Sequence, residues 1–168
     1  MIKALRDLVR ISSHSVCKIP NVLRVFINRL GDVIFARSLS HITFIVSDLD
    51  RMSEFLRVIF NAEEVYASDG KEFSLSKEKF FLINGIWIAV MEGNSNLEKS
   101  YNHVAFKIAD PDYDKYLNRI ESLGVEILRG RSRVKGEGRS IYFYDYDNHL
   151  FELHTGTLGQ RLARYKKC

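Results

Sequence analysis

Two histidines and one glutamate have the residue types and surroundings of a metal site. His41 and His103 each open an apolar segment, and Glu152 lies within a third. The three segments are Ser40-His41-Ile42-Thr43-Phe44, Asn102-His103-Val104-Ala105-Phe106 and Leu150-Phe151-Glu152-Leu153-His154. A carboxylate buried in such a segment needs a cationic partner. Two imidazoles and one carboxylate leave coordination positions open, which predicts a catalytic rather than a structural metal site.

The other ionisable candidates keep alternatives open. His154 follows Glu152 by two residues on the same strand face, so it could orient the carboxylate or replace a ligand. His149 is predicted to be a turn residue. Glu78 stands between Lys77 and Lys79, and on the sequence alone this pattern favours a solvent-exposed turn.

The two histidines are equivalent positions of an internal repeat with an offset of 62 residues. Each is followed seven residues later by an aspartate, Asp48 or Asp110, which we expect to cap a helix. Predicted helices span 50–60 and 112–123. Predicted strands beyond the first of each copy span 63–67, 71–75, 79–83 and 86–91, then 125–129, 140–145 and 149–154, with turns at Asn84-Gly85 and Asp147-Asn148.

Each copy therefore has the order strand, helix, strands of a βαβββ module. One such module buries only one face of its sheet. Two modules, about 39–98 and 99–158, predict an α+β fold in which a curved mixed sheet surrounds a metal site.

Composition separates an N-terminal segment from this domain. The chain has 168 residues, 46% of them hydrophobic, and a net charge of +4. Residues 1–39 hold seven basic and two acidic groups, whereas the remainder holds 18 basic and 19 acidic groups. The basic excess thus lies in a predicted amphipathic extension, 1–38, and gives the domain 39–168 no electrostatic support for nucleic-acid binding.

The role of the extension stays open between three interpretations: a membrane-surface or partner-binding helix, a targeting segment, or sequence that adds nothing to the fold. The chain has no apolar run of about 18 residues, so no transmembrane segment is expected. Cys17 and Cys168 form no disulfide framework, which predicts a reducing compartment and a cytoplasmic protein.

The paired modules with two histidines and a glutamate resemble the vicinal oxygen chelate (glyoxalase–bleomycin resistance) superfamily. Within it, 40–168 resembles the fosfomycin resistance proteins, and most closely their epoxide hydrolases. The resemblance rests on Leu39-Ser40-His41-Ile42-Thr43, Phe73-Ser74-Leu75-Ser76-Lys77-Glu78-Lys79-Phe80-Phe81, Tyr101-Asn102-His103, Gly136-Glu137-Gly138-Arg139-Ser140-Ile141-Tyr142-Phe143-Tyr144-Asp145 and Phe151-Glu152-Leu153-His154. The N-terminal extension departs from the family pattern.

The resemblance implies metal-dependent addition of water to the epoxide of fosfomycin, which gives the diol and confers resistance. It implies a Mn(II) site of His41, His103 and Glu152, with other divalent cations possible. It also implies a domain-swapped homodimer, in which one chain supplies His41 and the other supplies His103 and Glu152. Glu78 matches the general base of the hydrolases.

The phosphonate of the substrate requires several donors. A basic run is available at Arg129, Arg131, Arg133, Lys135 and Arg139. By the resemblance, the residues that bind or surround the substrate are Ser140, Tyr142 and Arg161, then Arg139 and Lys135, with Thr43 and Trp87 lining the pocket.

Three other functions fit parts of this pattern. A thiol transferase would open the same epoxide with the same metal site, but it needs a channel for the thiol. An extradiol-type dioxygenase would use two histidines and a carboxylate with iron(II). A non-catalytic drug-binding module generally lacks the metal ligands, which this chain retains.

Overall fold

The computed structural model describes residues 38–68, 70–71, 73–95, 98–128 and 136–166. From Ser40 onward these residues belong to one compact unit, Ser40–Cys168. The predicted extension, apart from Ser38, and most of the basic run, 129–135, lie outside the described residues. None of the helices in the described part is long and apolar enough to cross a membrane.

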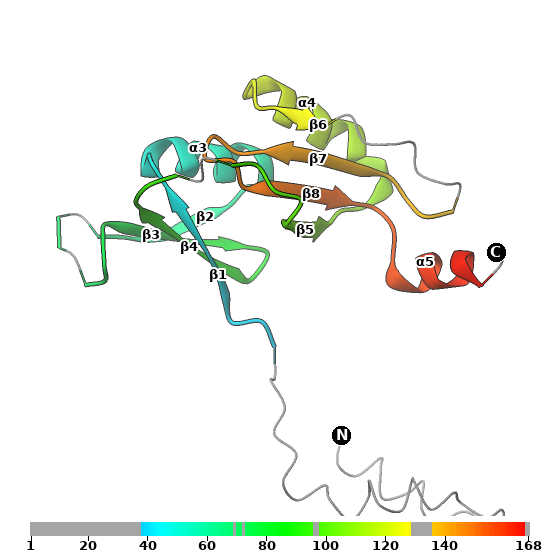
Figure 1. Cartoon of the computed structure of the whole chain (residues 1–168), viewed down its shortest axis with the longest axis horizontal. Coiled ribbons are helices and arrows are strands. Elements are labelled where there is room, and N and C mark those ends of the chain that lie inside the picture. Colours follow the sequence, from blue (N-terminus) through cyan, green and yellow to red (C-terminus); the bar gives the residue numbers. More distant parts are fainter. Residues whose placement is uncertain (1–37, 69, 72, 96–97, 129–135, 167–168) are drawn as a thin grey trace, which may run out of the picture. The chain divides into compact units, whose positions relative to one another are not determined.

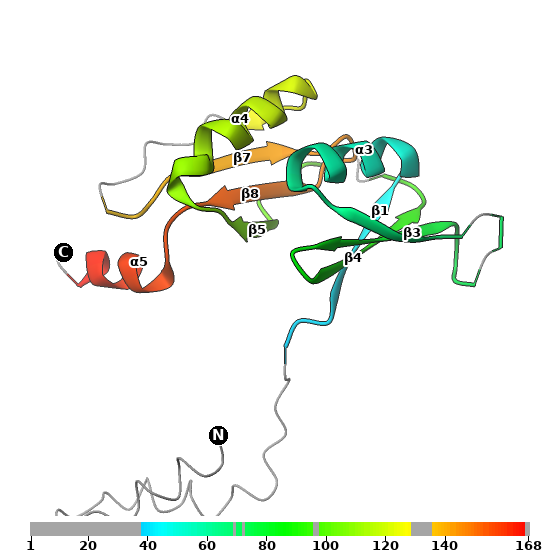
Figure 2. The same ribbon diagram turned by 180° about the vertical axis from the view of Figure 1, so that it is seen from behind.

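The first module forms one four-stranded sheet with one helix (Figures 1 and 2). Its elements are β1 (His41–Val46), α3 (Leu49–Phe60), β2 (Glu63–Ala67), β3 (Glu78–Ile83) and β4 (Ile86–Glu92). The strand order is β1-β4-β3-β2, in which β1 pairs parallel with β4 and the other pairs are antiparallel.

The second module repeats this topology. Its elements are β5 (His103–Lys107), the 3-10 helix η1 (Asp110–Asp112), α4 (Tyr113–Ser122), β6 (Ile127–Leu128), β7 (Ser140–Tyr144) and β8 (Leu150–His154), and α5 (Leu158–Tyr165) follows. The strand order is β5-β8-β7-β6, again with one parallel pair, β5 with β8. The predicted repeat of βαβββ modules and the α+β class are confirmed.

The two sheets differ from the predicted single curved sheet. Each described strand pairs only within its own module, and the modules meet through side chains instead. Aromatic rings from both modules pack together, with centroids 5.9 Å apart for Phe55 and Phe143 and 5.1 Å apart for Phe44 and Phe151. The fold therefore has one shared core beneath two separate sheets.

Helix α3 begins as its sequence predicts. The carboxylate of Asp48 accepts hydrogen bonds from the backbone N–H groups of Asp50 and Arg51, both at 2.9 Å. On its apolar stripe, Phe55 and Ile59 are fully buried.

The matching prediction for Asp110 is wrong. Asp110 begins η1, and α4 starts at Tyr113 after Asp112, without a side-chain cap at its N-terminus. The Asp110 carboxylate instead accepts a hydrogen bond from Arg139, so an ion pair takes the place of the cap.

The predicted strands agree with the structure to within two residues at each end, with one exception. No strand forms in the described part of 71–75, which lies in the loop between β2 and β3. Phe73 is 77% exposed and Leu75 is 95% exposed, so these two apolar side chains are not buried against a sheet of the described residues. The Asn84-Gly85 turn joins β3 to β4 as predicted, with φ of 48° and 81°, both in the left-handed region.

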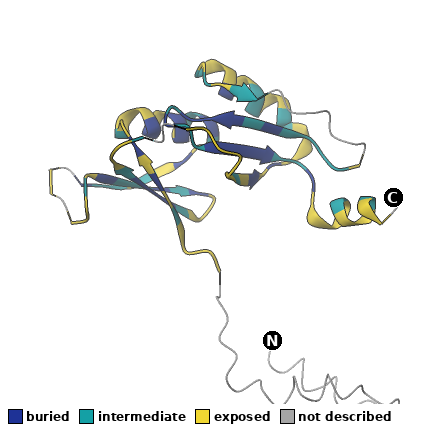
Figure 3. Ribbon diagram, viewed as in Figure 1, coloured by how far each residue is buried: buried dark blue, intermediate teal, exposed yellow. Residues whose placement is uncertain are grey.

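Helices α3 and α4 lie on the same side of the two sheets (Figures 1 and 2). On β1, Phe44 and Val46 face the core, whereas His41, Thr43 and Ile45 on the alternate face are exposed. Figure 3 shows a second contrast, between the many exposed residues on β1 and the mostly buried residues along β7 and β8. Each sheet therefore presents one face that the helices do not cover, and the candidate site residues lie on these faces.

Candidate metal and substrate site

His103 and Glu152 form a preorganised pair on the open face of the second sheet. Their closest atoms, Nε2 of His103 and Oε2 of Glu152, are 3.1 Å apart. Nδ1 of His103 lies 2.8 Å from the carbonyl oxygen of Tyr101, which can only accept, so Nδ1 donates there and Nε2 is the ring nitrogen that faces Glu152. Two atoms bound at about 2.1 Å to one ion and at right angles lie roughly 3 Å apart. The pair therefore fits a divalent metal.

Strand register brings further candidates onto the same face. Tyr142 lies opposite Glu152 across β7 and β8, and its ring stands edge-on to His103 at a centroid distance of 5.5 Å. Ser140 donates a hydrogen bond of 2.7 Å from Oγ to Oε1 of Glu152. Glu152 is 5% exposed, so this hydrogen bond and the histidine stabilise a carboxylate that is nearly removed from solvent.

The open face of the first sheet carries a different set. His41 is paired in register with Trp87, and their rings are 4.5 Å apart. Thr43 follows on the same face of β1. In the second module Ala105 pairs with Glu152, and the corresponding pair in the first module is Thr43 with Ala89. Ala89 therefore stands at the position equivalent to Glu152, so the first sheet has no carboxylate there.

Glu78 is the first residue of β3 and not part of an exposed turn. It is 8% exposed, and its backbone N–H donates to Oγ of Ser68 at 3.2 Å. Register makes Glu78 the counterpart of Ser140, since Glu78 pairs with Met91 in one module and Ser140 with His154 in the other. Glu78 thus lies on the open face that also carries His41.

The described part of one chain does not assemble the whole predicted metal site. It contains no group of three or more His, Cys, Asp or Glu side chains placed to hold an ion. His103 and Glu152 are together, and His41 lies on the other sheet. The three predicted ligands therefore lie on two different sheets of one chain.

The remaining predicted substrate ligands are Arg139, Lys135 and Arg161. Arg139 donates to Oδ1 and the carbonyl of Asp110 at 3.0 and 2.6 Å, and its guanidinium stacks 4.1 Å from the ring of Tyr113. These hydrogen bonds raise the pKa of Arg139 and lower that of Asp110. Lys135 is outside the described residues. Arg161 lies half-buried on α5, which a capping box of Thr157 and Gln160 starts.

Two supporting contacts were not predicted from the sequence. The carbonyl of Tyr101 orients His103, and a backbone oxygen leaves no residue-type signal. Asp147 accepts a hydrogen bond of 3.0 Å from the backbone N–H of Ser47 and so links the two modules. His149 was predicted to be a turn residue, but it follows the turn at 146–147 and directly precedes β8, and its Nδ1 lies 2.7 Å from the buried carboxylate of Asp145.

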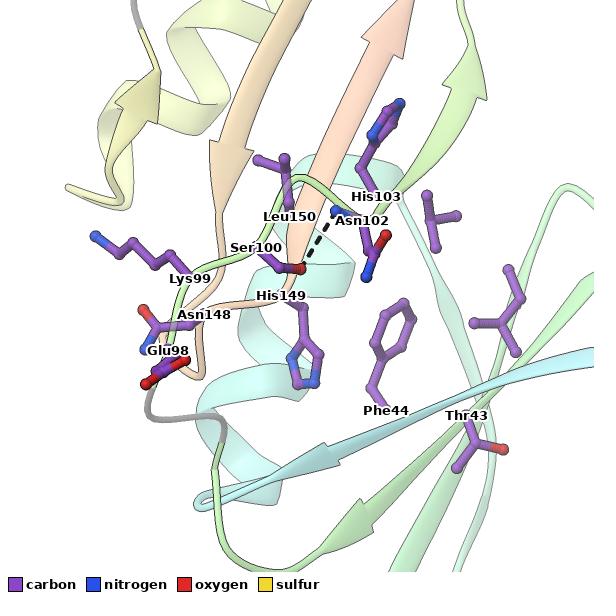
Figure 4. A pocket seen from close by; sticks show the side chains of 12 residues that line it. Thr43, Phe44, Glu98, Lys99, Ser100, Asn102, His103, Asn148, His149 and Leu150 are labelled. Atoms are coloured by element: carbon purple, nitrogen blue, oxygen red, sulfur yellow. Dashed lines mark hydrogen bonds between the residues drawn. The ribbon is translucent and has the colours of Figure 1, made fainter.

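A pocket of about 620 Å³ separates β1 from the start of β5 (Figure 4). Thr43 and Phe44 line it from the first module, and Asn102, His103 and His149 line it from the second. The metal-ligand candidate His103 and the substrate candidate Thr43 therefore border one common space.

Comparison with known proteins now gives the family. Residues 38–153 match the model of the Glyoxalase/Bleomycin resistance protein/Dioxygenase superfamily. The chain is also 65% identical over 127 residues to the fosfomycin resistance protein FosX of Listeria monocytogenes, covering 76% of this chain and 96% of that protein. The chain belongs to the FosX family of this superfamily.

Other relatives and a solved structure extend the FosX comparison. The metallothiol transferase FosB of Shouchella clausii is 37% identical over 134 residues, covering 77% of this chain and 87% of the relative. A crystal structure of a FosX mutant from Listeria monocytogenes, complexed with Mn(II) and 1S,2S-dihydroxypropylphosphonic acid, matches with a TM-score of 0.71 and 60% identity. That match covers 78% of this chain and 99% of the other.

Proposed function

We propose that this chain hydrolyses the epoxide of fosfomycin to the vicinal diol with Mn(II) and thereby confers fosfomycin resistance. The similarity to FosX proteins and to a FosX structure holding Mn(II) and a diol phosphonate supports this function. The observation that carries it is the His103–Glu152 pair, with Nε2 of His103 held 3.1 Å from the carboxylate. A site for one divalent ion needs this arrangement.

The third ligand comes from a second copy of the chain. The two open sheet faces have the same strand topology, so a two-fold axis can place the first face of one copy against the second face of its partner. His41 of one copy then joins His103 and Glu152 of the other, in a domain-swapped homodimer with two equivalent sites.

Mixing two inactive variants tests this assembly. His41→Ala and Glu152→Gln each remove a ligand from both sites of their own homodimer. In a swapped heterodimer of the two variants, one site retains all three ligands, so an equal mixture should recover about a quarter of wild-type activity. If each site were built within one chain, the mixture would stay inactive. Refolding each variant alone provides the control.

His103 and Glu152, with His41 of the second copy, would hold Mn(II), and the ion would supply Lewis acidity that stabilises negative charge developing on the epoxide oxygen. Glu78 accepts a proton from a water molecule as the water oxygen attacks the carbon next to phosphorus. The carbon–oxygen bond breaks, the ring oxygen takes up a proton from solvent, and the diol results. Base catalysis of this kind contributes about 10²–10⁴-fold to the rate.

The phosphonate needs donors that hold it during the attack. We assign this role to Ser140, Tyr142 and Arg161, with Thr43 and Trp87 lining the site from the other half. The indole Nε1 of Trp87 is buried and has no hydrogen-bond partner among the described residues. We do not assign Arg139 to phosphonate binding, because its guanidinium already donates a hydrogen bond to Asp110 and stacks on the ring of Tyr113.

A thiol transferase is the second candidate, since FosB proteins are also similar to this chain. Glu78 favours the hydrolase, because water needs a base that a thiolate does not. Purified protein with Mn(II) and fosfomycin should form the diol, followed by ³¹P NMR, at the same rate with and without glutathione, bacillithiol or cysteine. A thiol adduct and no diol would assign the transferase.

We also propose that the reaction takes place in the cytoplasm. The only two cysteines of the sequence, Cys17 and Cys168, give no disulfide framework of the kind that secreted domains use. A reporter fused to the C-terminus and assayed in cytoplasmic and periplasmic fractions tests this location.

A further inference from the structure

The hydroxyl of Ser140 lies between two side chains on the open face of the second sheet. Its Oγ is 2.7 Å from Oε1 of Glu152 and 2.8 Å from Nδ1 of His154. His154 and Glu152 are themselves 3.7 Å apart at these atoms, which is too far for a hydrogen bond. His154 therefore reaches the metal-ligand candidate through Ser140.

The hydrogen-bonding capacity of the Ser140 hydroxyl determines which group donates in each of these two hydrogen bonds. Ser140 has one proton, and a carboxylate only accepts, so Oγ donates to Glu152. The lone pairs of Oγ then face His154, whose Nδ1 must carry the proton and donate to Oγ. The order of donation is from His154 to Ser140 to Glu152.

The imidazole ring of His154 is held against the backbone. A Cβ atom at Gly156 would lie 2.5 Å from Nε2 and 2.9 Å from Cε1 of His154, so the ring occupies space that only glycine leaves open. The carbonyl of Gly156 in turn accepts a hydrogen bond of 2.7 Å from Nζ of Lys107. The ring therefore has a fixed place from which to donate to Ser140.

The fold does not require a histidine at this position. Met91 is its register counterpart in the first sheet, where it lies opposite Glu78 as His154 lies opposite Ser140. Both sheets have the same topology, so an apolar side chain satisfies the backbone and packing of this strand position. The histidine thus carries a chemical role that the methionine does not.

We propose that His154 is a positioning residue for phosphonate binding, an inference that rests on the proposed function. Its Nδ1–H anchors Oγ of Ser140, so that the hydroxyl proton can turn from Glu152 to a phosphonate oxygen while the oxygen atom stays in place. Donation into Oγ also strengthens the outgoing hydrogen bond through cooperativity. His154 therefore raises affinity for the phosphonate without touching it.

Three variants of His154 separate this role from a structural one. His154→Met removes the donor and copies the residue of the other sheet, and His154→Gln removes the Nδ1 donor with a polar side chain. His154→Asn keeps a donor near the position of Nδ1. Each is loaded with Mn(II) and titrated with 1,2-dihydroxypropylphosphonate, in parallel with steady-state kinetics on fosfomycin, Mn(II) binding by EPR and thermal melting.

We expect His154→Met and His154→Gln to weaken phosphonate binding and raise KM about 3- to 10-fold, the size of one hydrogen bond, with little change in kcat. His154→Asn should restore binding to within about twofold of wild type. In a Ser140→Ala background, His154→Met should have no further effect, because the residue it acts through is gone. Mn(II) affinity should stay unchanged.

Additive effects of Ser140→Ala and His154→Met on phosphonate binding would overturn the proposal. So would weaker Mn(II) binding with unchanged phosphonate affinity, since His154 would then act on Glu152 alone. The double-mutant cycle uses binding of the diol phosphonate, so it does not depend on turnover. A coupled cycle without diol formation from fosfomycin would refute the proposed function and leave this inference standing.

Discussion

Replacing Glu78 with glutamine tests the assignment of the base with little change in shape. The hydrogen bonds that the described residues give Glu78 come from its main chain: N–H donates to Oγ of Ser68 at 3.2 Å, and its carbonyl accepts from N–H of Ser68 at 3.0 Å. Glutamine keeps both. Its amide cannot take a proton from water, so only the proposed chemical role of the side chain is removed.

The effects of Glu78→Gln on kcat, on the free energy of unfolding and on Mn(II) affinity can be estimated separately. Loss of general-base catalysis lowers kcat by about 10²–10⁴-fold, which equals about 2.7–5.5 kcal/mol in activation free energy. Glu78 is 8% exposed, and an amide of equal size in this place should change the free energy of unfolding by less than about 1 kcal/mol. Mn(II) affinity should not change, because Glu78 is not one of the three proposed metal ligands.

The assay follows the diol by ³¹P NMR with Mn(II) in excess, together with EPR of bound Mn(II) and the Tm of each variant. Glu92→Gln is the matched control, because Glu92 ends β4, is exposed and pairs with Lys77 at 3.7 Å. It should retain activity within about twofold. Turnover of Glu78→Gln above roughly a tenth of wild type, with the control unchanged, would refute the role of Glu78 as the base.

The remaining expectations concern metal binding, core packing, acid stability and the N-terminal segment. His103→Ala should weaken Mn(II) binding by more than about 100-fold in an EPR titration, because a ligand is lost and not merely reoriented; retained affinity would remove His103 from the metal site. Phe151→Ala should lower the free energy of unfolding by about 3–5 kcal/mol in urea denaturation, since Phe151 is fully buried between the modules. Arg139 lowers the pKa of Asp110, so the stability from this ion pair is present above the ordinary aspartate pKa and is lost as pH falls through the lowered value. The variant Asp110→Asn lacks this ion pair at every pH. Its Tm should therefore differ less between neutral and acid pH than the Tm of the wild type does. Removal of residues 1–37 should leave diol formation unchanged, because the family match begins at residue 38; a truncated chain that fails to fold would show that the segment supports the domain.

Features that depend on local periodicity and repeats could be predicted from the sequence. The match between the segments of His41 and His103 predicted two modules, and both adopt the same strand order. Asp48 was predicted as a helix cap from its place before an amphipathic stripe, and it caps α3. These features depend on neighbours within a few residues or on a fixed offset, and the sequence contains both kinds of information.

Features that depend on which partner a side chain finds across the fold were not predicted correctly. Asp110 has the sequence surroundings of a cap, but Arg139, 29 residues later, takes its carboxylate. Phe73 and Leu75 have a strand-like pattern, yet both are exposed and no strand of the described residues covers them. Competition between a local contact and a distant one is decided by tertiary geometry, which single-sequence patterns do not contain.

The two modules share a backbone plan but carry complementary chemistry, and this difference restricts how copies of the chain can assemble. Where Glu152 stands on one sheet, the other has Ala89, and where Glu78 stands on the first, the second has Ser140. A dimer that joined like faces would place two bases in one site and two histidine–glutamate pairs in the other. Only the union of unlike faces gives each site two imidazoles, the proposed metal-binding carboxylate and the proposed base. The asymmetry of the repeat therefore supports the swapped arrangement, and recovery of activity in the mixed variants is its direct test.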